Sequence, residues 1–269
     1  MTHAYGILFS MHIKYLWTQL LPLIIFSFIF ANSAKSTTSQ TLNIAVASNF
    51  SHTIDQIKPL FEEYAKVLLT ISKASSGKLY AQILNGAPYD VFLSADSEKP
   101  KRLIQKKLAD SATQIIYATG KLLLWVPNKN IGKLDVALLI DPSIKKIAIA
   151  NSKLTPYGLA TEEFLTHTNL LKNLKPKFVI GENINQTYNY ISTGNAHCGF
   201  VALSQLKQSK QDSAPGIWLI PSNLYNPIQQ SAVLLKKTLN YKAAKDFLAF
   251  LKSSEIKVLI QAAGYEVSS

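Results

Sequence analysis

The sequence of 269 residues has little cysteine, little arginine and no apolar run long enough to cross a membrane. Its one cysteine, Cys198, excludes a disulfide framework, a cysteine-ligated zinc ion and an iron–sulfur cluster. Glycine and proline number 11 each, which excludes collagen-like and low-complexity chains. With 48% hydrophobic and 10% aromatic residues, the chain is too apolar to be disordered, and its length suits one large domain or two modest ones.

Acidic residues are also scarce, since 28 Lys and Arg stand against 16 Asp and Glu and give a formal charge of +12. Arg102 is the only arginine, and the lysines are spread from Lys14 to Lys257 without a run longer than two. Reading of DNA bases relies on bidentate arginine, which lysine imitates poorly. We therefore expect a soluble, lysine-rich surface and no nucleic-acid partner.

Residues 1–34 have the pattern of a secretory signal peptide. Lys14 precedes an apolar core at 20–30, and small residues follow up to Ala34, so we expect cleavage after Ser33 or Ala34. As a helix this core would span about 16 Å, roughly half the hydrocarbon thickness, so it is too short for a membrane anchor. Met11 is an alternative start to Met1. No cysteine follows the core, which argues against a lipid anchor, and we expect a periplasmic protein.

From residue 41 onward, short apolar runs alternate with amphipathic segments of helical spacing. This alternation predicts an α/β architecture with mainly parallel sheets flanked by helices. We expect strands at 41–47, 67–72, 91–94, 121–126, 147–150, 177–180, 198–202 and 231–236. The helices are expected at 54–64, 79–84, 100–107, 159–166, 187–193, 243–251 and 255–263.

Polar residues gather at four junctions where a strand ends and a helix begins: 47–50, 74–78, 155–158 and 181–186. Ligands of doubly wound sheets bind beyond the carboxyl ends of strands, and helix N-termini attract anions because their first N–H groups are unpaired. Four such junctions at one point would suit a fully deprotonated oxyanion. Alternatively, Ser48, Ser76 and Asn183 are ordinary N-caps, because these residue types dominate that position.

At these junctions the chain resembles periplasmic molybdate-binding proteins, which capture substrate for an ABC importer of molybdate and tungstate. The resemblance runs from about residue 42 to 265 and is carried by residues 43–50, 74–77, 86–96, 156–159, 181–187 and 199–204. It implies a two-lobed periplasmic binding protein fold of type II with two hinge-strand crossings. The first lobe would comprise 41–120 and, on the return, 230–269, and the second lobe 121–229.

The resemblance also implies the binding residues for molybdate or tungstate: Ser48, Asn49, Ser76, Tyr157 and Ile184. The two serines would donate hydroxyl and backbone hydrogen bonds, Asn49 its backbone N–H and its side chain, and Tyr157 and Ile184 backbone N–H groups. Ala202 stands where the better-known branch of the family has a tyrosine that reaches the anion. No cofactor and no metal held directly by side chains is implied. The expected partner is the permease at the inner membrane, and the protein is expected to be a monomer.

Two alternatives stay open. The transport role could serve sulfate or another small oxyanion, since sulfate differs from molybdate mainly in radius. More distantly, the same fold could carry an enzyme or a sensor. We expect no enzyme, because no Gly-x-Ser-x-Gly or dinucleotide fingerprint is present and His52, His167 and His197 lack metal-ligand spacing. Asp90 and Asp96 flank a buried strand and are expected to brace loops.

Overall fold

The computed structural model of the chain describes residues 40–127, 135–211 and 216–267. The expected signal peptide, with its cleavage point at Ser33 or Ala34 and the alternative start at Met11, lies outside these ranges. Within them, no helix combines the length and the apolar character needed to cross a bilayer.

The first of two five-stranded sheets has the order β2-β1-β3-β10-β4. Its strands are β1 (Thr41–Ala47), β2 (Leu68–Ala74), β3 (Val91–Ser94), β4 (Ile115–Gly120) and β10 (Ile228–Leu234). β1 pairs in parallel with β2 and β3, whereas β10 runs antiparallel to both β3 and β4. β10 is therefore the one reversed strand of this sheet.

The second sheet has the order β7-β6-β8-β5-β9. Its strands are β5 (Leu122–Trp125), β6 (Ile147–Ala150), β7 (Phe178–Gly181), β8 (Cys198–Ala202) and β9 (Ile217–Leu219). β6 pairs in parallel with β7 and β8, and β5 runs antiparallel to β8 and β9. Each sheet thus has four strands in one direction and a fifth against them, as expected for mainly parallel sheets.

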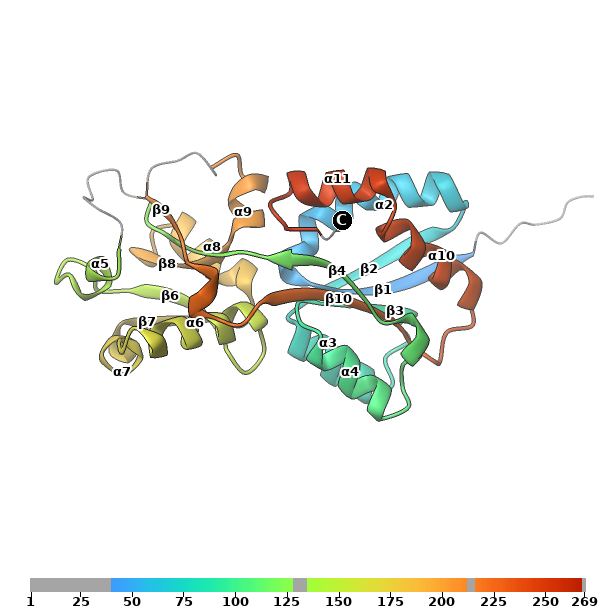
Figure 1. Cartoon of the computed structure of the whole chain (residues 1–269), viewed down its shortest axis with the longest axis horizontal. Coiled ribbons are helices and arrows are strands. Elements are labelled where there is room, and N and C mark those ends of the chain that lie inside the picture. The colour runs from blue at the N-terminus through green and yellow to red at the C-terminus, as the bar shows by residue number, and fades with distance from the viewer. Residues whose placement is uncertain (1–39, 128–134, 212–215, 268–269) are drawn as a thin grey trace, which may run out of the picture. The chain divides into compact units, whose positions relative to one another are not determined.

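Helices cover both faces of each sheet (Figure 1). On the first sheet they are α2 (Ser51–Ala65), α3 (Ser76–Leu84), α4 (Glu98–Gln105), α10 (Tyr241–Leu251) and α11 (Ser254–Ala262). On the second they are α5 (Ala137–Ile140), α6 (Pro156–His167), α7 (Leu171–Leu174), α8 (Ile184–Ser192) and α9 (Leu203–Gln208). This confirms the α/β prediction.

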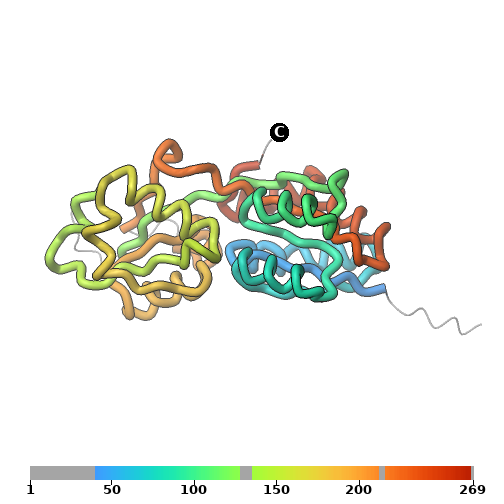
Figure 2. The backbone as a smooth tube through the Cα atoms, turned by 90° about the horizontal axis from the view of Figure 1, so that it is seen from below, coloured from blue at the N-terminus to red at the C-terminus, as the bar shows by residue number. Residues whose placement is uncertain are grey.

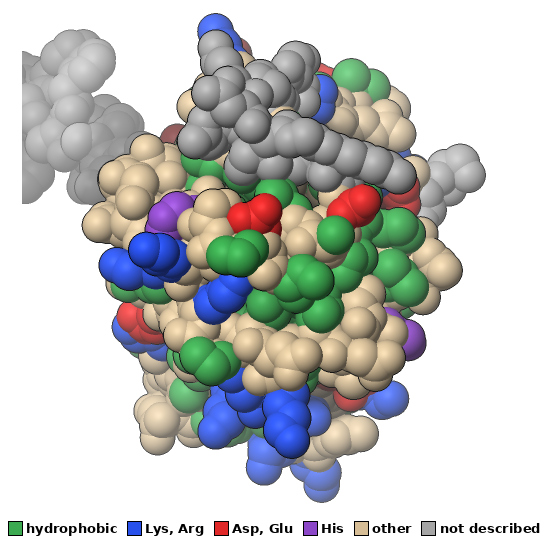
Figure 3. Space-filling view, turned by 90° about the vertical axis from the view of Figure 1, so that its left-hand side faces the viewer, with side chains coloured by type: hydrophobic (Ala, Val, Ile, Leu, Met, Phe, Trp, Pro, Cys, Tyr) green, Lys and Arg blue, Asp and Glu red, His purple; other side chains and the backbone are tan. Residues whose placement is uncertain are grey.

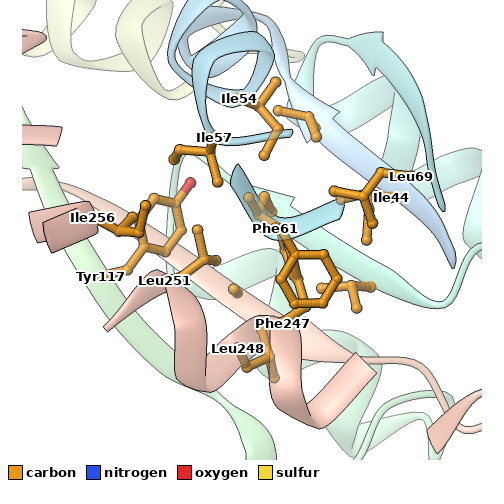
Figure 4. Packing of buried hydrophobic residues seen from close by; sticks show 14 of the residues in the cluster. Ile44, Ile54, Ile57, Phe61, Leu69, Tyr117, Phe247, Leu248, Leu251 and Ile256 are labelled. Carbon is orange, nitrogen blue, oxygen red and sulfur yellow. The ribbon is translucent and has the colours of Figure 1, made fainter. Parts of the chain in front are cut away.

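Side-chain alternation along the strands divides the core of the first sheet into two layers. Ile44 of β1 lies with Phe61 of α2 and Phe247 of α10, whose rings make an edge contact at a centroid distance of 5.1 Å (Figure 4). Ala45, next along β1, belongs to the layer under α3 and α4, with Leu79. The first sheet therefore packs against helices on both faces.

The chain crosses between the sheets twice (Figures 1 and 2). It leaves β4 at Gly120 and enters β5 at Leu122, and it returns after β9 through a short 3-10 turn, η5 (Ser222–Leu224), into β10. The reversed strand of each sheet is thus the strand that the chain enters on crossing. Two sheets joined by two crossings confirm the expected two-lobed fold.

The structure adds elements that the sequence patterns did not predict. β4 was not expected, because its burial follows neither a strict alternation nor a continuous buried run. β9 has three residues, too few for a recognisable period. Another helical turn, η2 (Ser48–Phe50), joins β1 directly to α2, so helix begins earlier than residue 54.

Candidate functional site

One small cavity lies where the carboxyl ends of strands from both sheets face each other. The space measures about 200 Å³, including the part open to solvent. It is lined by Ala47, Ser48, Asn49, Ser75, Ser76, Ala95, Thr155, Pro156, Tyr157, Asn183 and Ile184. The structure therefore brings together all five residues predicted for the site, although their role as anion ligands stays a prediction.

The start of α6 presents the backbone N–H of Tyr157 to this cavity. Thr155 is the N-cap, and its Oγ1 accepts the N–H of Gly158 at 2.9 Å. Pro156 at the first helical position has no N–H. The N–H of Tyr157 is therefore the first-turn donor that the cap leaves without a partner.

The start of α8 repeats this arrangement at Ile184. Asn183 is the N-cap, and its Oδ1 accepts the N–H groups of Asn185 and Gln186, each at 3.0 Å. The N–H of Ile184 is left outside the cap. The capping alternative is therefore confirmed for Asn183, and the cap directs its neighbour's N–H toward the cavity.

At α3 the cap is Ser75, whose Oγ accepts the N–H of Lys78 at 3.3 Å. Ser76 is not the cap, so that alternative is wrong for it, as it is for Ser48, which follows the cap Ala47 of η2. The Oγ of Ser76 accepts the N–H of Ala95 at 3.0 Å. Because this bond occupies a lone pair and not the hydroxyl proton, Ser76 can still donate.

Asn49 reaches the cavity with its backbone while its side chain points away. Its Nδ2 donates to Oε1 of Gln230 at 2.7 Å and to Oη of Tyr265 at 3.1 Å, which uses both amide protons. The Oη of Tyr265 in turn donates to the carbonyl oxygen of Asn49 at 2.8 Å. Its backbone N–H is therefore the donor that Asn49 can offer. The expected side-chain hydrogen bond to the anion would require this network to rearrange.

No charged side chain is among the described residues that line the cavity. At its rim, Lys78 of α3 and Glu182 form an ion pair at 2.8 Å between the lobes, with both side chains about half exposed. Nearby, the N–H of Gly77 donates to the carbonyl of Leu154 at 2.9 Å. A Cβ at position 77 would lie 2.9 Å from Leu154 Cα, so only glycine permits this approach. The lobes are in contact across the cavity.

The Tyr157 side chain runs from the cavity toward the first crossing. Its Oη is buried without a hydrogen-bond partner, and burial raises the pKa of this phenol well above its usual value. A Cβ at Gly120 would lie 2.1 Å from this Oη. One residue therefore links the cavity to the strand that connects the lobes.

Other residues considered from the sequence lie apart from the cavity. Asp90 accepts the N–H of Asn43 at 2.7 Å and the hydroxyl of Thr238 at 2.6 Å, which confirms its bracing role. Ala202 is fully buried in the second core and does not line the cavity. Figure 3 shows the end of the second lobe that faces away from the first lobe, and basic side chains gather along the lower part of this surface. They form a solvent-facing surface separate from the cavity.

Sequence reasoning missed three polar groups that shape the site. Serine and threonine are favoured at N-caps, but Ser75 and Thr155 stand four residues before the predicted helix starts at 79 and 159, so their positions did not mark them as caps. Gln230 carried no such signal, since a single glutamine in a strand is unremarkable and its partner Asn49 is 181 residues away.

Comparison with known proteins places this geometry in a family. Residues 42–266 match the model of the bacterial extracellular solute-binding proteins. The chain is 39% identical over 221 residues to the molybdate-binding protein ModA of Rhodobacter capsulatus, covering 82% of this chain and 86% of the relative. It is 36% identical over 224 residues to ModA of Azotobacter vinelandii, covering 83% and 89%.

Solved structures agree with this assignment. The periplasmic molybdate-binding protein of Azotobacter vinelandii superposes with a TM-score of 0.80 at 36% identity, covering 85% of this chain and all of that chain. The sulfate-binding protein SubI of Mycobacterium tuberculosis has a TM-score of 0.71 at 12% identity, covering 86% of this chain and 88% of that chain, which shows the shared fold alone. The chain therefore belongs to the bacterial extracellular solute-binding proteins, in the branch that contains the molybdate-binding proteins.

Proposed function

We propose that this protein captures molybdate, and tungstate in the same way, as the solute-binding component of an ABC importer. The observation that carries the proposal is the cavity at which helix starts of both lobes present uncapped N–H groups. The molybdate-binding relatives support the choice of ligand. Ser48, Asn49, Ser76, Tyr157 and Ile184 are the proposed binding residues.

The proposed ligand set consists of five backbone N–H groups and the hydroxyls of Ser48 and Ser76. Hydrogen bonds to a charged acceptor contribute about 1.5–3 kcal/mol each, so a full set supports sub-micromolar binding after the costs of ordering and desolvation. A dianion without a proton needs only donors. Phosphate keeps a proton near neutral pH, and no carboxylate among the described lining residues could accept it.

The transport cycle follows from the two-lobed fold. The lobes, proposed as residues 41–120 with 230–269 and residues 121–229, would close over the anion by bending at the two crossings. Closure completes a surface that an inner-membrane permease can recognise. Export through the signal peptide at 1–34, a periplasmic location, a monomeric state and the lack of enzymatic activity or a nucleic-acid partner are parts of the same proposal.

Isothermal titration of the chain from Lys35 onward tests the proposal. Molybdate and tungstate should bind with one site per chain, at least about a hundredfold more tightly than sulfate, and phosphate should not compete. Equal affinity for sulfate would instead assign the protein to sulfate or a broader set of oxyanions. No heat with any of the four anions would reject the transport function.

A further inference from the structure

We propose that Gln230 is a positioning residue of the anion site, which holds the backbone N–H of Asn49 in place through the Asn49 side chain. The inference rests on the proposed function. Gln230 lies in β10, outside the cavity, and is fully buried.

The amide of Gln230 is oriented by its own strand. Its Nε2 donates to the carbonyl oxygen of Ile228 at 3.0 Å, so its Oε1 must face the other way, toward Asn49. There it accepts the Asn49 Nδ2 at 2.7 Å. The ladder between β10 and β4 shifts register between Gln230 and Ser231, which is the irregularity that a β-bulge introduces. Bulges change the direction of the side chains next to them, and here the Gln230 side chain points toward Asn49.

Asn49 is fixed at three points as a result. Its Nδ2 bonds Gln230 and Tyr265, and its carbonyl oxygen accepts from Tyr265 at 2.8 Å and from Ser204 at 3.3 Å. Ser204 belongs to α9 of the second lobe, whereas η2 with Asn49 belongs to the first. The network therefore ties the Asn49 peptide to β10, to the C-terminal segment and to the opposite lobe.

A buried polar network of this kind is favourable only when every member is satisfied. Replacement of Gln230 by methionine keeps the volume but leaves the Asn49 Nδ2 without its nearest acceptor. The Asn49 side chain can then turn, and its backbone N–H loses a fixed direction. Because Asn49 stands in the first turn of the helical segment that η2 and α2 form, no preceding turn offers a carbonyl to hold its N–H.

The test combines Gln230→Met with Gln230→Glu in molybdate titrations between pH 6 and pH 8. Gln230→Met should weaken binding at least about tenfold, with a dissociation rate increased by a similar factor. A protonated glutamic acid can donate to the Ile228 carbonyl and accept from Asn49 as glutamine does, whereas the carboxylate cannot donate and adds negative charge near the dianion. Affinity of Gln230→Glu should therefore recover as the pH falls, while the wild-type affinity and that of Gln230→Met change little.

The other groups that face Gln230 do not produce this pH profile. The phenols of Tyr157 and Tyr265 have pKa values raised by burial, so both stay neutral between pH 6 and pH 8. The Lys121–Glu266 ion pair lies beside the first crossing. Wild-type protein titrated in parallel corrects for the Lys121–Glu266 pair and for the anion itself.

Two results would overturn the inference: wild-type affinity in Gln230→Met, or a Gln230→Glu affinity that does not change with pH relative to wild type. If Gln230→Met does not fold, the pH series of Gln230→Glu still decides. Hydrogen exchange at the Asn49 amide of the ligand-free protein separates this inference from the proposed function. Faster exchange in Gln230→Met supports positioning even if the wild type binds no oxyanion, and unchanged exchange contradicts it.

Discussion

Two adjacent serines at the start of α3 have different tasks. Ser75 caps the helix by accepting the N–H of Lys78, and Ser76 accepts the N–H of Ala95 while its own proton remains available. Both side chains are buried and both line the cavity. Ser75→Ala therefore removes a structural hydrogen bond alone, whereas Ser76→Ala removes the bond to Ala95 together with the proposed donor to the ligand.

Ser76→Ala should weaken molybdate binding at least about tenfold, because it removes a donor to a charged acceptor. Ser75→Ala is the matched control, which should lose about 1 kcal/mol of unfolding free energy with its cap but keep its affinity within about threefold. Titration calorimetry and urea denaturation of both variants measure the two effects. Equal affinities in the two variants would remove Ser76 from the proposed ligand set.

Individual site residues were predictable to the extent that local sequence defines them. Ser48, Ser76, Tyr157 and Ile184 stand where a predicted strand gives way to a predicted helix, and the family resemblance singled them out. Which of the two serines caps α3 was not predicted, because the helix was expected to begin at 79 and residue type alone does not choose between positions 75 and 76. The engagement of Asn49 by Gln230 is a contact between distant segments, and no local pattern encodes it.

At the scale of elements, α6 and β4 meet at the first crossing. Tyr157 follows the N-cap of α6, and its phenol ends against Gly120, the last residue of β4. The Tyr157 side chain is buried and cannot swing into solvent. Only glycine leaves room for the Tyr157 phenol at position 120. A larger residue there should displace the Tyr157 side chain and, with it, the backbone N–H at the cavity.

Gly120→Ala should lower the unfolding free energy by about 1–3 kcal/mol, the usual cost of overpacking, and should weaken molybdate binding. The contact that it creates is with the Tyr157 Oη at 2.1 Å, whereas the next ring atom is at 3.0 Å. Adding Tyr157→Phe should therefore restore part of both losses, and Tyr157→Phe alone is the control. Denaturation and titration of the three variants check this. A Gly120→Ala protein as stable as the wild type would contradict the proposed contact.

Elements with a clear period were predicted well, and elements without one were not. The buried runs of β1, β3, β6 and β8 and the amphipathic faces of α2 and α10 all appear as expected. β4 was missed because this edge strand of the first sheet is only partly buried and shows no regular period. The reversed directions of β5 and β10 were also outside reach, since strand direction depends on the path between the sheets.

At the scale of the whole molecule, the account depends on convergence. Four junctions spread over more than half the chain meet at one cavity, and the lobes that carry them touch through Lys78–Glu182 and Gly77–Leu154. Sequence spacing cannot show such convergence, so the two-lobed fold rested on the family resemblance. Most of the residues that line the cavity are buried, and hydrogen bonds from them to a dianion are stronger because water is excluded there.

The most direct test is the position of the metal atom in crystals of the molybdate-loaded protein, located by its anomalous scattering. The account predicts one molybdenum site per chain, in the cavity, with its oxygens within hydrogen-bond distance of the N–H groups of Tyr157 and Ile184 and the hydroxyls of Ser48 and Ser76. A molybdenum peak on the lysine-rich surface, with none between the lobes, would contradict it.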